Sequence, residues 1–182
     1  MRTEPVDLIF YVIFGIVGFG LRVAFESYNK HKNATRLDAW RINVKELEDR
    51  LSLFFWPLFF RLKRGDEAWK SNNLRSDTDD PQRKQLADTF DAVVIMENHK
   101  ETKEIIQKYY YLAGGDKKLE QAILGLLHHI DVYISLREAG LEHDPIWVGS
   151  GFPDEIVELV EERLYEHQAS YDQMLKDAKS FI

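Results

Sequence analysis

The stretch LSLFFWPLFFRL, residues 51–62, is apolar around its whole circumference. It extends a pattern of apolar positions that begins at Leu47 and advances in steps of four, three, four and four residues. The positions concerned are Leu47, Leu51, Phe54, Leu58 and Leu62. Such steps place side chains on one face of a helix. Pro57 has no amide hydrogen, so we expect it to kink or split this helix.

Two interpretations of residues 51–62 are open. The first makes them the hydrophobic centre of a helical domain, which needs a segment of this kind, and we favour it. The second makes them an interfacial segment, too short to span a bilayer, with aromatic side chains among lipid headgroups and basic side chains on lipid phosphates. The side chains that would meet the lipid are Phe54, Phe55, Trp56, Phe59, Phe60 and Arg61.

The residues that follow carry helix signals and no convincing alternating strand pattern. Residues 65–80 are polar and predict a loop. Capping and breaking residues then divide the chain: a start at Asp80-Pro81, an end at Gly114-Gly115, a cap at Asp116, an end at Gly140 and a start at Pro153. The sequence therefore predicts an all-α fold, with a compact bundle of about four to five helices after the N-terminal segment.

The N-terminal run LIFYVIFGIVGFGL, residues 8–21, contains no charged residue. Extended to Val6–Phe25, with Arg22 reaching toward the interface, it forms a helix of about 30 Å, which matches the hydrocarbon thickness. A core helix and a cleaved signal peptide are the alternatives, and both fit less well because the run is apolar on every face and acidic residues precede it. The residues assigned to this single transmembrane helix are Leu8, Phe10, Val12, Phe14, Ile16, Phe19, Leu21 and Arg22.

Charge is unevenly distributed along the chain. Residues 1–64 hold 11 basic and 7 acidic residues, a net +4, whereas residues 65–182 hold 13 and 24, a net −11. Basic residues after the apolar run predict that the C-terminal domain lies on the cytoplasmic, or capsid-facing, side. The acidic distal part makes nucleic acid an unexpected partner. We divide the chain into a membrane anchor (1–28), a juxtamembrane basic linker (29–40) and a helical domain (41–182).

The sequence contains no motif for catalysis, a cofactor or a metal. It has no cysteine, which excludes disulfides and thiolate chemistry. HExxH and ExxH pairs, phosphate loops and nucleophile elbows are missing. His128 and Asp131 share a helix face, but two groups do not make a metal site. His129 lies on an apolar stripe with Tyr133, which indicates a core histidine bonded to a carbonyl or a tyrosine. We therefore predict no cofactor and no small-molecule substrate.

Two features suggest a surface for protein partners. Trp147 lies outside the predicted helices; such a residue usually packs onto its own domain, but tryptophan is also common as an interface anchor. Glu158, Glu162 and Glu166 follow each other at i, i+4 spacing and repel unless basic groups meet them. They form either a solvated helix face or half of an electrostatic interface.

Four stretches carry a resemblance to a known group of proteins. They are FFWPLFFRLKRGDEAW (54–69), ENHKETKEIIQKYYYLA (97–113), LLHHIDVYISLREAG (126–140) and DPIWVGSGFP (144–153). In their order they resemble uncharacterised membrane-anchored helical proteins of large double-stranded DNA viruses. The resemblance implies a virion or assembly role, such as a minor capsid component that ties the shell to an inner membrane. It supplies no functional residues to transfer.

The leading prediction is a non-enzymatic, membrane-anchored scaffold that binds protein partners, with capsid proteins as the partners that the resemblance implies. The alternative is a membrane-tethered sensor or enzyme with a polar site inside the bundle, formed by His129, Tyr133 and carboxylates of neighbouring helices. That alternative requires a polar pocket with at least three convergent titratable groups, and a dry apolar core around His129 would exclude it.

Overall fold

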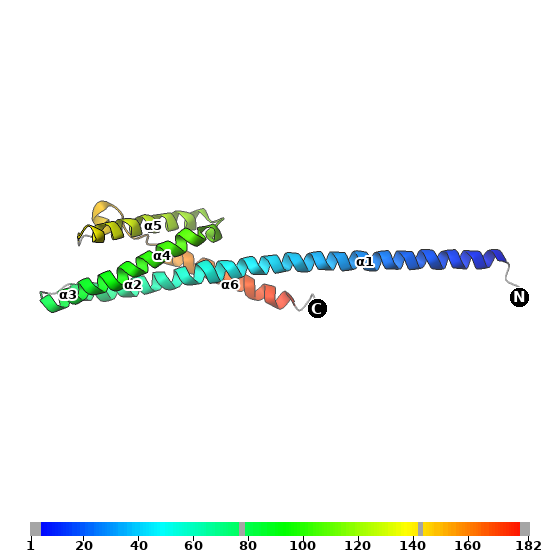
Figure 1. The fold of residues 1–182 in the computed structure, drawn as a ribbon, viewed down its shortest axis with the longest axis horizontal. Helices are drawn as coiled ribbons and strands as arrows, with labels where there is room; N and C mark the ends of the chain where they lie inside the picture. The colour runs from blue at the N-terminus through cyan, green and yellow to red at the C-terminus, as the bar shows by residue number, and fades with distance from the viewer. Residues whose placement is uncertain (1–4, 77–78, 142–143, 179–182) are drawn as a thin grey trace. The chain divides into compact units, whose positions relative to one another are not determined.

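The computed structural model describes residues 5–76, 79–141 and 144–178, and it describes side chains within those ranges except for residues 5–17 and 73–76. Every regular element in the described ranges is helical, which confirms the all-α prediction (Figure 1). The α-helices are α1 (Pro5–Asp49), α2 (Trp56–Ser76), α3 (Pro81–Phe90), α4 (Met96–Tyr109), α5 (Lys117–Glu138) and α6 (Ile156–Asp177). The π-helical segments are η1 (Arg50–Phe55) and η2 (Asp91–Ile95), and the 3-10 segments are η3 (Tyr110–Ala113) and η4 (Pro145–Val148).

The chain forms two compact units. The first consists of Met1–Lys45 with Met174–Ile182, and the second of Glu46–Gln173. In the first unit the indole Nε1 of Trp40 donates a hydrogen bond to the carbonyl of Met174 at 3.1 Å. Residues 29–40, predicted as a basic linker, are helical and belong to α1. The functional division into residues 1–28, 29–40 and 41–182 stays a prediction.

The predicted transmembrane helix lies in α1. In the part of the chain that the structure describes, no helix has both the length and the apolar character that crossing a bilayer requires. The side chains of the predicted anchor residues Leu8, Phe10, Val12, Phe14 and Ile16 lie outside that part. Farther along, Phe19 and Leu21 are exposed, and Arg22 pairs with Glu26 at 2.9 Å.

Residues 51–62 form the centre of the second unit, as the favoured interpretation predicted. Phe54, Phe55 and Leu58 are at most 1% exposed. Apolar residues from four other segments complete this core: Ile106 of α4, Leu112 of η3, Ile123 and Ile130 of α5, and Val160 and Leu164 of α6. The interfacial alternative is therefore wrong for Phe54 and Phe55, whose rings contact protein. Trp56 and Phe60, which point away from this core, are 43% and 60% exposed.

The expected disturbance at Pro57 is also present. The hydrogen bonding changes to the wider π pattern over Arg50–Phe55, and the amide of Trp56 donates to the carbonyl of Leu51. This wider turn immediately precedes the one residue that has no amide hydrogen to donate, and π-bulges and prolines are recognised causes of helix distortion.

The loop predicted for residues 65–80 is wrong over most of its length, because α2 continues to Ser76. Gly65 is a point of close approach between α2 and α4, not a turn. A Cβ atom at this position would lie 3.0 Å from Nδ2 of Asn98. The buried positions that follow, Ala68 and Asn72, are small or polar, so this part of α2 has no apolar periodicity to reveal it.

The predicted helix boundaries otherwise hold. Asp80 and Asp116 cap α3 and α5 through their carboxylates. Gly140, with a φ angle of 72°, follows the end of α5 in the left-handed conformation that glycine tolerates best. Helix α6 begins at Ile156, three residues after the predicted start at Pro153. Figure 1 shows α2 beside α3 and α4, and α4 also packs against α5.

The structure predicts a sharp contrast between two phenylalanines of one segment. Phe54→Ala removes a fully buried ring and should lower the free energy of unfolding by about 3–5 kcal/mol. Phe60→Ala, the matched control at an exposed position, should change it by no more than about 0.5 kcal/mol. Urea unfolding of the full chain, followed by circular dichroism, measures both values. Equal effects of the two variants would contradict the placement of the core.

Candidate functional site: a cavity between α2, α4 and α5

A cavity of about 560 Å³ lies in the second unit. Its walls come from the middle of α2, from α4, from α5 and from the segment 144–157 that leads into α6. Apolar side chains such as Leu62, Leu126 and Ile130 form the part of the wall that adjoins the core. The cavity opens where Ile146 and Phe152 are exposed.

Three titratable rings meet in this cavity. His129 and Tyr133 are one helical turn apart on α5, so both project from the same face. His99 comes from α4, and its ring centroid lies 4.5 Å from that of Tyr133 and 5.8 Å from that of His129. Trp69 of α2 packs edge-on to Tyr133, and Phe152 packs edge-on to His129. The centre of the site is therefore an aromatic cluster with ionisable members.

His129 is held as a neutral ring of defined tautomer. Its Nδ1 lies 3.0 Å from the backbone carbonyl of Ser150, which only accepts, so Nδ1 carries the hydrogen. Burial lowers the pKa of His129, and the Ser150 carbonyl and the Asp144 carboxylate oppose this shift only in part. In the neutral ring Nε2 is an acceptor, and none of the described groups donates to it. The predicted bond from His129 to a backbone carbonyl is confirmed.

His99 is more strongly perturbed. Burial, and secondarily the charge of a protonated His129, lower the pKa of His99 to about 4. The Asp91 carboxylate and the backbone of Ile95 oppose this shift only in part. In the neutral ring one of the two nitrogens is an acceptor. Two histidines this close cannot both be charged at low cost. At neutral pH the cavity therefore presents two uncharged imidazoles.

Tyr133 belongs to a closed network on the far side of the cluster. Its hydroxyl donates to Oδ1 of Asp91, while Nε of Arg137 donates to Oδ2 of the same carboxylate at 2.6 Å. The Arg137 guanidinium also lies 4.7 Å from the centroid of the Tyr133 ring. Burial raises the pKa of Tyr133, and the hydrogen bond to Asp91 adds to this. The hydroxyl therefore stays protonated, and its hydrogen is already committed.

Asn98 lies in the wall of the cavity and carries a buried, unsatisfied acceptor that has almost no accessible surface. It is 3% exposed, and its Nδ2 donates to the carbonyl of Arg61 at 3.0 Å. This bond fixes the amide orientation and leaves Oδ1, a buried oxygen without any hydrogen-bond partner. The hydroxyl of Thr102, one turn farther along α4, donates to the carbonyl of Asn98 at 2.6 Å. Buried polar atoms without partners are rare in proteins and call for an explanation.

The charged groups around the cavity leave an acidic excess. Arg61 pairs with Glu101, and Asp66 pairs with Lys70 at 2.5 Å. Asp144 and Asp154 also line the cavity, and no described basic side chain pairs with either carboxylate. The unbalanced charge of the site is therefore negative.

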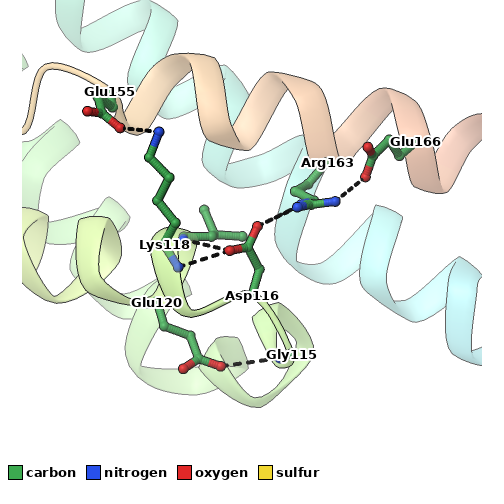
Figure 2. Close-up of polar contacts among 8 residues, drawn as sticks. Gly115, Asp116, Lys118, Glu120, Glu155, Arg163 and Glu166 are labelled. Carbon is green, nitrogen blue, oxygen red and sulfur yellow. Dashed lines mark hydrogen bonds and ion pairs between the residues drawn. The ribbon is translucent and has the colours of Figure 1, made fainter.

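Most of the predicted partner surface lies elsewhere in the second unit. Trp147 is 78% exposed in η4, next to the cavity opening. Glu166 is paired within the chain: Figure 2 shows Arg163 between Glu166 and Asp116, and Lys118 with Glu155. Glu158 and Glu162 are exposed, and no described basic side chain pairs with them. The ion pairs of Arg163 and Lys118 join the start of α5 to α6 and neutralise part of the acidic stretch.

His128 and Asp131, which the sequence analysis considered and set aside as a metal site, gain no third ligand among the described residues. Asp131 is bound by Lys103 at 2.6 Å. Within the described residues no three histidine or carboxylate side chains are grouped so that they could hold a metal ion. Comparison with models of protein families, with curated proteins and with solved structures finds no match.

The sequence analysis identified His129 and Tyr133 but missed His99, Asn98 and Asp91. These three lie on the chain from η2 into α4, and their spacing carries no motif. The sequence contains one weak signal. Asn98 and His99 are polar, yet they fall near the face of the helix that runs from Ile95 to Thr102, and a buried helix face normally carries apolar residues.

The perturbed pKa of His99 makes stability depend on pH. The unfolded chain protonates this residue near pH 6.5 and the folded chain near about 4, so between these values the unfolded state binds more protons. Stability should therefore rise with pH across this window. Relative to His99→Gln, wild type should gain up to about 3 kcal/mol between pH 4 and pH 7.

Urea unfolding of both proteins at several pH values measures this difference. Wild type and the variant contain the same carboxylates, so the contributions of these groups to the pH dependence cancel in the comparison. The ring resonances of His99, followed by NMR, give an independent titration. A ring that titrates near pH 6.5 would contradict the assigned burial.

Proposed function

We propose that the chain is a membrane-anchored helical protein that binds a small organic molecule in the cavity between α2, α4 and α5. The observation that carries the proposal is the convergence of His99, His129 and Tyr133 in one cavity. The volume of about 560 Å³ falls in the range typical of small-molecule sites. An apolar wall with a few oriented polar groups is also typical of such sites.

The geometry favours binding over catalysis. A nucleophile needs a base within hydrogen-bonding distance. The hydroxyls of Tyr133 and Thr102 donate to other groups, and His129 bonds to the carbonyl of Ser150 and not to its hydroxyl. We therefore propose a sensor or carrier.

The anchor is supported by the uncharged run of residues 8–21 and by the basic residues that follow it. The exposure of Phe19, Leu21 and Phe25 also supports it, because a row of exposed large apolar side chains marks a surface that meets lipid or protein. In this proposal the second unit lies on the cytoplasmic, or capsid-facing, side.

Alkaline carbonate extraction tests the anchor in the full-length protein. Wild type should remain in the membrane pellet, and Ile13→Arg with Ile16→Arg should move the protein to the supernatant, since each arginine at mid-bilayer costs about 2.5–3.5 kcal/mol. Phe60→Arg is the control and should stay in the pellet. Release of wild type would overturn the anchor, and release of Phe60→Arg would assign membrane binding to the exposed aromatics after Pro57.

A second candidate function is the non-enzymatic scaffold. It is favoured by the exposed apolar side chains of η4, where Ile146, Trp147 and Val148 are each more than 60% exposed. A protein partner would cover them, and the resemblance to viral membrane-anchored proteins would make that partner a capsid protein. Binding in the cavity separates the two candidates.

A cavity-blocking variant tests ligand binding. Gly151 lines the cavity, and an added Cβ would meet no atom within 4 Å. Gly151→Phe should therefore fill the opening and abolish binding of small aromatic fragments, and Gly151→Ala should retain it. The readout is the 19F signal of 5-fluorotryptophan at Trp69, assigned with Trp69→Phe. If no fragment moves this signal in wild type, or if Gly151→Phe binds equally well, the binding function fails and the scaffold remains.

A further inference from the structure

We propose that the cavity is selective for a planar organic cation that carries N–H donors, such as an amidine or a guanidine. This inference rests on the proposed binding function and names the class of ligand. Its basis is the combination of unsatisfied acceptors, unpaired carboxylates and aromatic walls in one cavity.

The polar atoms that the cavity offers are acceptors. Nε2 of His129 is an acceptor because Nδ1 donates to Ser150. The neutral His99 ring likewise has one nitrogen that is an acceptor. A ligand that satisfies these atoms must bring several N–H or O–H donors.

The charges select a cation among such donors. Asp144 and Asp154 line the cavity without a described basic partner. The nearby cations are already engaged, because Arg61 pairs with Glu101 and Arg137 with Asp91. An anion would meet uncompensated negative charge, and a neutral ligand would leave it uncompensated.

The aromatic walls fit a flat, delocalised charge. Trp69 and Phe152 line the cavity beside Tyr133 and His129 respectively. A cation over an aromatic face is attracted by the electrons of the ring, and tryptophan is the strongest partner. The Tyr133 ring already has the guanidinium of Arg137 beside it, so Trp69 and Phe152 are the rings open to a ligand. Planar guanidinium-like groups also stack on such faces.

A series of three probes tests the inference in the full-length protein. Benzamidine, benzamide and benzoate share one shape and carry charges of about +1, 0 and −1 at pH 7. Titrations follow the 19F signal of Trp69, with calorimetry for the dissociation constants. Benzamidine should bind at least about tenfold more tightly than benzamide, and benzoate should not bind measurably.

Charge-neutralising variants locate the source of the preference. Asp144→Asn with Asp154→Asn should weaken benzamidine at least about tenfold and leave benzamide unchanged. Glu158→Gln with Glu162→Gln is the matched control, because it removes the same total charge from exposed positions outside the cavity. This control should bind benzamidine like wild type.

The outcomes separate this inference from the proposed function. Equal binding of benzamide and benzamidine, tighter binding of benzoate, or an equal effect of the control pair overturns the cation inference while the cavity remains a binding site. The inference also falls if none of the three probes moves the Trp69 signal while other neutral fragments do. If no fragment of any charge moves that signal, both the inference and the binding function are overturned.

Discussion

The burial of one face of residues 51–62 is the constraint on which the second unit depends. Phe54, Phe55 and Leu58 are almost completely buried, so each needs neighbours on several sides. A single helix cannot supply those neighbours, so α4, α5 and α6 must each present an apolar stripe to the same axis. The packing of α4, α5 and α6 follows from that requirement, and so does the position of the face of α5 that adjoins the cavity.

Helix α5 shows how one element serves both the core and the cavity. Leu119, Ile123, Leu126 and Ile130 follow one another at helical spacing and enter the core. His129 and Tyr133 lie on the adjacent strip, because each is three residues beyond a core position. The cavity therefore lies directly beside the core and takes its rigidity from it. Low exposure to solvent follows, and with it the neutral state of both histidines.

Much of the fold was accessible from sequence because it depends on local chemistry. Asp80, Asp116 and Gly140 set helix ends through caps and a left-handed turn, and these effects act within a few residues. The end of α2 was missed because its helical state depends on packing against α4 at Gly65, where a glycine that suggests a turn instead permits close approach. Tertiary contact decided the conformation there, and no single-segment pattern records it.

The site was only partly accessible for a related reason. His129 and Tyr133 lie on one helix, so their spacing in the sequence was enough to predict that they are neighbours. His99 and Asn98 come near them only because α4 packs against α5. The pairing of Asp91 with Arg137 and Tyr133 is equally a product of packing. Asp91 accepts from both Tyr133 and Arg137 on its side of the cluster, whereas Nε2 of His129 receives no hydrogen from the described groups on the other. The asymmetry between a closed network on one side and open acceptors on the other is what distinguishes a site from a buried polar cluster.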